Sequence, residues 1–116
     1  MTTKVQFRLR ITKGEMIALG PGKVALLEAI IETGSITAAA KYLGMSYRRA
    51  WMLVDAMNRC MKSSVVATSP GGRDGGGTMV TPIGLEIIKR YRAIEREATA
   101  ATGSDIRALM KLLSDD

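Results

Sequence analysis

Histidine is absent from the 116-residue chain, and cysteine occurs once, at Cys60. Zinc sites draw on several Cys and His ligands, and most acid–base and triad mechanisms use His, so the composition argues against a metal site and against enzymes of those classes. One cysteine excludes a disulfide within the chain, which fits a reducing compartment. No apolar run approaches the roughly 18 residues of a membrane span, and the N-terminal MTTKVQFRLR does not resemble a signal peptide. We therefore expect a cytoplasmic protein that is not an enzyme.

Aromatic residues make up only 4% of the chain, whereas 47% of all residues are apolar. The core must therefore consist of Ala, Leu, Ile, Val and Met. The eight methionines suit that role because their flexible side chains fill irregular gaps. A chain of this length forms one core, so we expect a single domain over residues 1–116.

Acidic residues are few in most of the chain. Residues 1–92 contain 14 Lys or Arg and 6 Asp or Glu, residues 93–116 contain 3 and 5, and the net charge is +6. A basic body favours a polyanionic partner such as nucleic acid, but many basic proteins simply carry a solvated basic face. Charge alone leaves both alternatives open.

The first third of the chain predicts a strand, a loop and a helix. Apolar and polar residues alternate from Val5 to Ile11, which is the period of a half-buried strand. Glycine and proline then indicate a loop over residues 14–22. The nearly all-apolar segment Lys23–Glu32 predicts a buried helix, and Gly34 follows it where a left-handed cap favours glycine.

Residues 35–60 predict two short helices joined by a tight turn. Ser35 is a suitable N-cap for the first helix, and Gly44 ends it. Ser46 then caps a second helix that runs to about Cys60. Small residues are needed where two such helices cross, and alanines supply them. These are Ala39, Ala40 and Ala50.

The start of the second helix has the residue types that bind DNA. In a helix-turn-helix this turn enters the major groove, where Arg pairs with guanine edges and hydroxyl groups hold phosphates. The candidate DNA-contact residues on the two helices are Ser35, Thr37, Lys41, Ser46, Tyr47, Arg48, Arg49 and Trp51. The alternative is a solvated basic helix start beside a structural tryptophan, and the pattern leaves open whether Trp51 contacts DNA or packs in the core.

A glycine-rich loop lies between two predicted strands, Val65–Thr68 and Thr78–Thr81. After a recognition helix, such a loop is placed as a wing whose backbone approaches phosphates or the minor groove. Gly72 and Arg73 are its candidate DNA contacts. A plain hairpin connection is the alternative. A nucleotide-phosphate cradle is disfavoured, because the loop has no Gly-Lys-Ser/Thr ending and a strand precedes the next helix.

A long helix is predicted over residues 82–102, because Thr81 is a cap and Pro82 suits the first helical position. Apolar residues in it are spaced 4, 3, 4 and 3 apart, which is the rhythm of a coiled coil and favours a homodimer. The candidate interface residues are Ile87, Tyr91, Ile94, Ala98 and Ala101. An ordinary core-packing helix shows the same pattern over two heptads and is the alternative. A short helix is predicted over residues 104–113.

The run GSITAAAKYLGMSYRRAW, followed by DAMN, the glycine-rich loop and TPIG, resembles the N-terminal DNA-binding domain of ModE-type molybdate-responsive regulators. It is more distantly similar to LysR-type winged helix domains, which share the Gly-Ser-hydrophobic-Thr/Ser-x-Ala-Ala start. The resemblance covers nearly the whole chain and implies a mainly α winged helix-turn-helix with an N-terminal strand, a small β wing and a long dimerisation helix. Members of the family continue into molybdate-binding domains that have no counterpart in these residues, so we expect no molybdate site and no cofactor within this chain.

Together these patterns predict a homodimeric, sequence-specific regulator that binds double-stranded DNA and controls transcription of molybdenum-related genes. The alternative is a protein-interaction or architectural module that keeps the winged fold but binds DNA weakly or not at all. A nucleotide-dependent enzyme that uses the glycine loop is the least favoured function.

Overall fold

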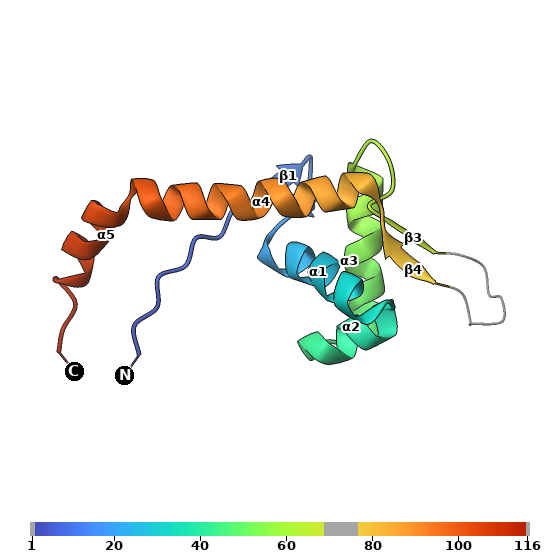
Figure 1. Cartoon of the computed structure of the whole chain (residues 1–116), viewed down its shortest axis with the longest axis horizontal. Coiled ribbons are helices and arrows are strands. Elements are labelled where there is room, and N and C mark those ends of the chain that lie inside the picture. Colours follow the sequence, from blue (N-terminus) through green and yellow to red (C-terminus); the bar gives the residue numbers. More distant parts are fainter. Residues whose placement is uncertain (1, 69–76, 116) are drawn as a thin grey trace.

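The computed structural model describes residues 2–68 and 77–115. The elements in chain order are β1 (Ile11–Lys13), β2 (Met16–Leu19), α1 (Pro21–Thr33), α2 (Ile36–Leu43), α3 (Tyr47–Cys60), β3 (Val66–Thr68), β4 (Thr78–Val80), α4 (Pro82–Ala101) and α5 (Gly103–Met110). Figure 1 shows α1, α2 and α3 gathered into a body, from which α4 projects towards α5 and the two chain ends. The mainly helical architecture with two small two-stranded sheets confirms the predicted fold class.

Helix α1 forms the centre of the body because it is apolar on nearly every side. Leu26 and Leu27 are fully buried, and Ile30 is 1% exposed. Burial of one such side chain contributes about 1.5–3 kcal/mol. Helices α2, α3 and α4 and strand β4 all contact α1. The helix begins two residues before its predicted start, because Pro21 occupies the first helical turn, and Gly34 ends it in the predicted left-handed conformation.

Helices α2 and α3 both begin at the predicted N-caps. The Ser35 hydroxyl accepts a hydrogen bond from the Ala38 N–H at 3.0 Å, and the Ser46 hydroxyl accepts one from the Arg49 N–H at 3.1 Å. Gly44 has a φ of 72°, a left-handed conformation that only glycine adopts without strain. Fully buried alanines then allow the close approach of the two helices. Ala39 and Ala50 are both 0% exposed.

The prediction of a strand from Val5 to Ile11 was wrong except at its last residue. Residues 2–10 form no strand, and the first hairpin instead pairs β1 with β2 around Gly14, which has a φ of 62°. A strand needs a partner, and this tight turn places β2 opposite residues 11–13 only. The predicted loop over residues 14–22 likewise contains β2 and the start of α1. The segment before β1 instead lies against α4, where the Tyr91 hydroxyl donates to the Leu9 carbonyl oxygen at 2.7 Å.

Strands β3 and β4 pair antiparallel, with Val66 opposite Val80, and agree with the predicted wing strands to within one residue. The loop that joins them, including Gly72 and Arg73, lies outside the described residues. Helix α4 follows directly, with Pro82 in its first turn as predicted. Helix α5 ends at Met110, three residues before its predicted end.

Candidate nucleic-acid interface

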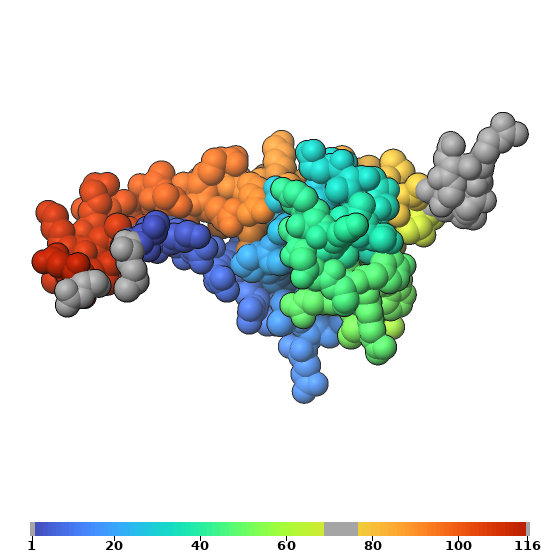
Figure 2. Space-filling view, turned by 90° about the horizontal axis from the view of Figure 1, so that it is seen from below, coloured from blue at the N-terminus to red at the C-terminus, as the bar shows by residue number. Residues whose placement is uncertain are grey.

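Helices α2 and α3 form one face of the body. Figure 2 views the molecule from the side on which α2 lies, and residues of α2 and α3 (cyan to green) cover the body there. The inner side of α3 is buried, with Ala50 and Met57 at 0% exposure and Val54 at 6%. Met61, which continues the predicted inward stripe, is partly buried. The opposite side of α3 is therefore the side that is free to meet a partner.

The first two turns of α3 present polar and aromatic side chains to solvent. Arg48 and Arg49 are exposed, Tyr47 is 54% exposed and Trp51 is 49% exposed. The alternative of a core tryptophan therefore does not apply to Trp51. Within the described residues, neither arginine forms a salt bridge. Both guanidinium groups thus keep their donors for an external acceptor.

The candidate residues on α2 and at its start differ in accessibility. Thr37 and Lys41 are exposed on the outer side of α2. Ser35 is partly buried, and its hydroxyl oxygen is engaged as the N-cap. The hydroxyl of Ser46 has the same capping role but is exposed. The structure therefore brings the α2 residues and the α3 residues to adjoining helices of one motif, while Gly72 and Arg73 fall outside the described residues.

A shallow hollow of about 360 Å³ lies beside the start of α3. Its lining residues are Ser46, Arg48, Arg49, Met52 and Leu53. Met52 is 55% exposed and was absent from the predicted site. It follows Arg48 by four positions, so helical spacing alone would have placed both residues on one face. An apolar group beside two guanidinium groups suits a surface that meets both base edges and thymine methyl groups.

Lys23 is a second residue that the sequence prediction missed, because it begins a segment that is nearly all apolar. It lies in the first turn of α1 and is only 8% exposed. Burial lowers the pKa of its ammonium group. Proximity to Cys60 opposes this shift in pKa, and the positive charges of Arg10 and Arg49 reinforce it. Lys23 thus adds positive charge close to α3, in a place where burial makes that charge costly.

The predicted interface residues of α4 fall into two groups. Ile87 packs against the core, and Tyr91 is 2% exposed and bonded to Leu9 of its own chain. Farther along the helix, Ile94 is 46% exposed, Ala98 is partly buried and Ala101 is exposed. The first pair follows the core-packing alternative within the chain, whereas the second group is accessible to a partner.

No other kind of site stands out in residues 2–68 and 77–115. That part of the chain has no cluster of three or more His, Cys, Asp or Glu side chains arranged to hold a metal ion. None of its helices is both long enough and apolar enough to cross a membrane. Cys60 is a free, partly buried thiol.

Sequence comparison finds several relatives, although no family model matches the chain. The molybdenum-pterin-binding protein MopB of Rhodobacter capsulatus is 51% identical over 77 residues, which are 66% of this chain and 28% of that protein. The molybdenum transport protein ModE of Azotobacter vinelandii is 37% identical over 122 residues, covering 96% of this chain and 45% of that protein. The transcriptional regulator ModE of Haemophilus influenzae is 34% identical over 88 residues, covering 76% and 34%. None of these names describes an enzyme.

Structure comparison agrees in fold. The DNA-binding domain of CbnR, solved as a complex with DNA, matches with a TM-score of 0.58 at 22% identity and covers 77% of this chain and 95% of that domain. This likeness places the chain in the winged helix-turn-helix fold of LysR-type DNA-binding domains. The chain spans less than half the length of the three sequence relatives named above. The sequence relationship and the shared fold together identify it as a homologue of the N-terminal region of the ModE proteins.

Proposed function

We propose that this chain is a sequence-specific, double-stranded DNA-binding transcriptional regulator that inserts the start of α3 into the major groove. One observation carries the proposal. The first turns of α3 expose Arg48, Arg49 and Trp51, and within the described residues neither arginine forms a salt bridge. The opposite side of the same helix is buried at Ala50, Val54 and Met57. A helix attached to its domain by one face and basic on the other suits groove reading.

The roles of the individual residues follow from their chemistry. Arg48 and Arg49 suit bidentate pairing with guanine, and the aromatic ring of Trp51 suits contact with thymine methyl groups. Tyr47 and the N-terminal N–H groups of α3 suit phosphate contact. On α2, Thr37 and Lys41 are placed for the DNA backbone. Gly72 and Arg73 stay proposed wing contacts on the basis of the sequence alone.

The proposal includes a homodimer. The Cα radius of gyration is 17.1 Å, compared with about 13 Å expected for a compact domain of this length. An apolar groove of about 340 Å³ runs between the β1–β2 hairpin, the segment before it and α4, beside the exposed Ile94. A second copy that covers this groove and the outer part of α4 would bury surface that the single chain leaves in water. Two copies would also supply two recognition helices for paired half-sites.

Molybdenum-related genes are the proposed targets because the relatives carry molybdenum in their names. An architectural or protein-interaction module is the second candidate. Within the described residues, 16 large apolar side chains are exposed, and four of them lie in α5 or just after it (Leu109, Met110, Leu112 and Leu113), which suits a protein partner.

Selection of bound sequences from random DNA, followed by affinity measurements over a range of salt concentrations, tests the proposal. Arg48→Ala and Arg49→Ala should each weaken binding to the selected site by about 1–3 kcal/mol if the arginine pairs with a base, and should lower discrimination against altered sites. An arginine that contacts only phosphate should instead lower the salt slope by about 0.9 and leave discrimination unchanged.

Arg59→Ala is the matched control, since Arg59 lies on the same helix but is exposed at its far end and paired with Asp55 at 3.0 Å. It should change neither the affinity nor the salt slope beyond a general charge effect. Failure to enrich any sequence, or equal affinity of both arginine variants and the wild type, would favour the architectural module.

A further inference from the structure

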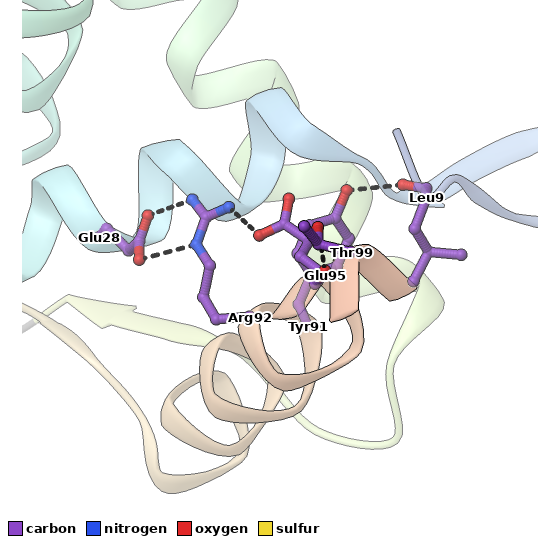
Figure 3. A network of polar contacts seen from close by, with 6 residues as sticks. All are labelled: Leu9, Glu28, Tyr91, Arg92, Glu95 and Thr99. Carbon is purple, nitrogen blue, oxygen red and sulfur yellow. Dashed lines mark hydrogen bonds and ion pairs between the residues drawn. The ribbon is translucent and has the colours of Figure 1, made fainter. Parts of the chain in front are cut away.

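An ion-pair cluster joins α4 to α1 at the middle of the long helix. Arg92 of α4 donates from Nε to Oε2 of Glu28 at 3.1 Å, and its Nη2 contacts the other carboxylate oxygen of the same residue. The remaining terminal nitrogen, Nη1, donates to Oε1 of Glu95 at 2.7 Å. Figure 3 shows the guanidinium held between the two carboxylates, with Glu28 on α1 and the other two residues on α4. This fork-to-fork geometry is directional as well as attractive.

The neighbouring residue, Tyr91, ties α4 to the segment before β1. Tyr91 donates its hydroxyl to the Leu9 carbonyl oxygen at 2.7 Å. Adjacent residues of a helix point about 100° apart. Tyr91 and Arg92 therefore hold α4 on two sides at one level, which restricts rotation of the helix about its own axis.

A second fixed point lies near the start of α4. A Cβ atom at Gly84 would be 2.5 Å from the Val65 carbonyl oxygen and 2.6 Å from the Val80 side chain, so the backbone of α4 lies directly on the body there. Gly84 and Arg92 are eight residues apart, which is about 12 Å along a helix. Two contacts at this separation define a direction. The Arg92 cluster therefore fixes the angle of α4 relative to the helices that carry the candidate DNA site.

We propose that the pair of Glu28 and Arg92 is a positioning contact that sets the spacing between the two DNA half-sites of a dimer. The inference rests on the proposed function. If the outer part of α4 lies at the dimer interface, its angle to the body sets the distance between the two recognition helices. A tilt of about 10° moves a point about 20 Å from the pivot by about 3.5 Å, which is close to one base-pair step of about 3.4 Å.

A purely stabilising ion pair would behave differently. The side chains of Glu28 and Arg92 are 39% and 32% exposed, so solvent screens the pair and its contribution to stability stays small beside that of the buried core of α1. Loss of the pair should therefore leave the fold intact. Its specific effect should appear only where two copies must bind one duplex at a defined distance.

The experiment compares duplexes that carry one selected half-site with duplexes that carry two, separated by spacers varied one base pair at a time. The wild type should prefer one spacing. Arg92→Ala should reduce the affinity ratio between the preferred spacing and its neighbours by about tenfold, or about 1.4 kcal/mol. Affinity for the single half-site and the unfolding midpoint should stay close to wild type. Glu28→Gln should reproduce the effect, and Arg92→Lys should give an intermediate ratio because lysine cannot form the bidentate pair.

Lys89→Ala is the matched control. Lys89 is exposed on the same helix, does not line the apolar groove proposed for the second copy, and forms no ion pair within the described residues. Its spacing preference should equal that of the wild type. A sharp wild-type preference retained by both Arg92→Ala and Glu28→Gln would overturn the inference while the proposed function stands. Absence of any half-site binding by the wild type would overturn the proposed function and the inference with it.

Discussion

The side-chain oxygen of Asn58 accepts a hydrogen bond from the Val65 N–H at 2.8 Å, which joins the last turns of α3 to the chain entering the wing. The same oxygen lies 3.4 Å from the Val66 nitrogen, and the amide nitrogen of Asn58 donates to the Val66 carbonyl oxygen at 3.5 Å. One side chain thus substitutes for a neighbouring strand at the edge of β3. These contacts hold the chain that enters β3 against the last turns of α3.

Replacement of Asn58 with alanine should therefore destabilise the protein by about 1–3 kcal/mol, because the buried Val65 and Val66 N–H groups lose their acceptor. Urea unfolding followed by circular dichroism measures this. Asn58→Asp keeps an acceptor for the Val65 N–H but turns a second oxygen towards the Val66 carbonyl oxygen, so it should recover only part of the lost stability. Equal stability of Asn58→Ala and wild type would mean that water replaces the side chain without penalty.

Two glycines near helix starts should respond to alanine in opposite directions. Gly84→Ala should destabilise the protein by about 1–3 kcal/mol, since its Cβ would overlap a backbone oxygen that must move. Gly22→Ala meets no atom within 4 Å and should stabilise the protein by about 0.4–1 kcal/mol, because alanine loses less entropy on folding. Thermal unfolding of the two variants gives the comparison. A stabilising Gly84→Ala would show that α4 does not rest as closely on Val65.

Lys23 should make the free energy of unfolding depend on pH in the alkaline range. Its pKa in the folded protein lies below the ordinary value of 10.5, chiefly because of burial. Between these two values the unfolded chain holds a proton that the folded protein has released, so the contribution of Lys23 to stability rises with pH in that window. Lys23→Met should therefore be more stable than wild type at pH 7, and the difference should shrink as pH approaches 10.5.

Urea unfolding of both proteins at a series of pH values tests this dependence. Lys62 is exposed, so Lys62→Met controls for the general effect of replacing a lysine with methionine. A Lys23→Met variant that is less stable at neutral pH would indicate that the aliphatic part of the lysine packs better than methionine.

Trp51 and Met57 lie on opposite sides of α3 and should separate binding from stability. Met57 is 0% exposed, so Met57→Ala should cost about 2–5 kcal/mol of stability. Trp51 is 49% exposed, so Trp51→Ala should change stability by about 0.5 kcal/mol or less. Its affinity for the selected duplex should fall by about 1 kcal/mol, or roughly fivefold, if the ring contacts a base. Unchanged affinity would remove Trp51 from the proposed site.

The features that the sequence predicted well depend on neighbouring residues. Ser35, Gly44 and Ser46 mark helix ends because a cap is formed within three or four residues of the chain. The wing strands and the start of α4 were predicted for the same reason, since Thr81 and Pro82 are local signals. The sequence therefore predicted the ends of both helices of the helix-turn-helix closely.

The features that the sequence predicted poorly depend on residues far away along the chain. An alternating segment such as Val5 to Ile11 becomes a strand only if a neighbour is present, and β2 is too short and too close to pair with all of it. The pair of Arg92 and Glu28 joins residues 64 positions apart, and no local pattern indicates it. Trp51 was ambiguous because the sequence shows only the spacing of a helix face, whereas its exposure depends on how α3 packs.

The exposed cap at Ser46 has one further consequence. Its oxygen accepts the Arg49 N–H, which uses a lone pair and leaves the hydroxyl proton unassigned. The Ser46 hydroxyl can therefore cap the helix through its oxygen and, at the same time, donate its proton to a phosphate. Alanine would lose both interactions, whereas aspartate would keep the cap and repel the phosphate. Threonine, by contrast, would keep both the acceptor and the donor of the hydroxyl group. The set of residues that can replace Ser46 therefore depends on two requirements, the helix cap and the phosphate contact.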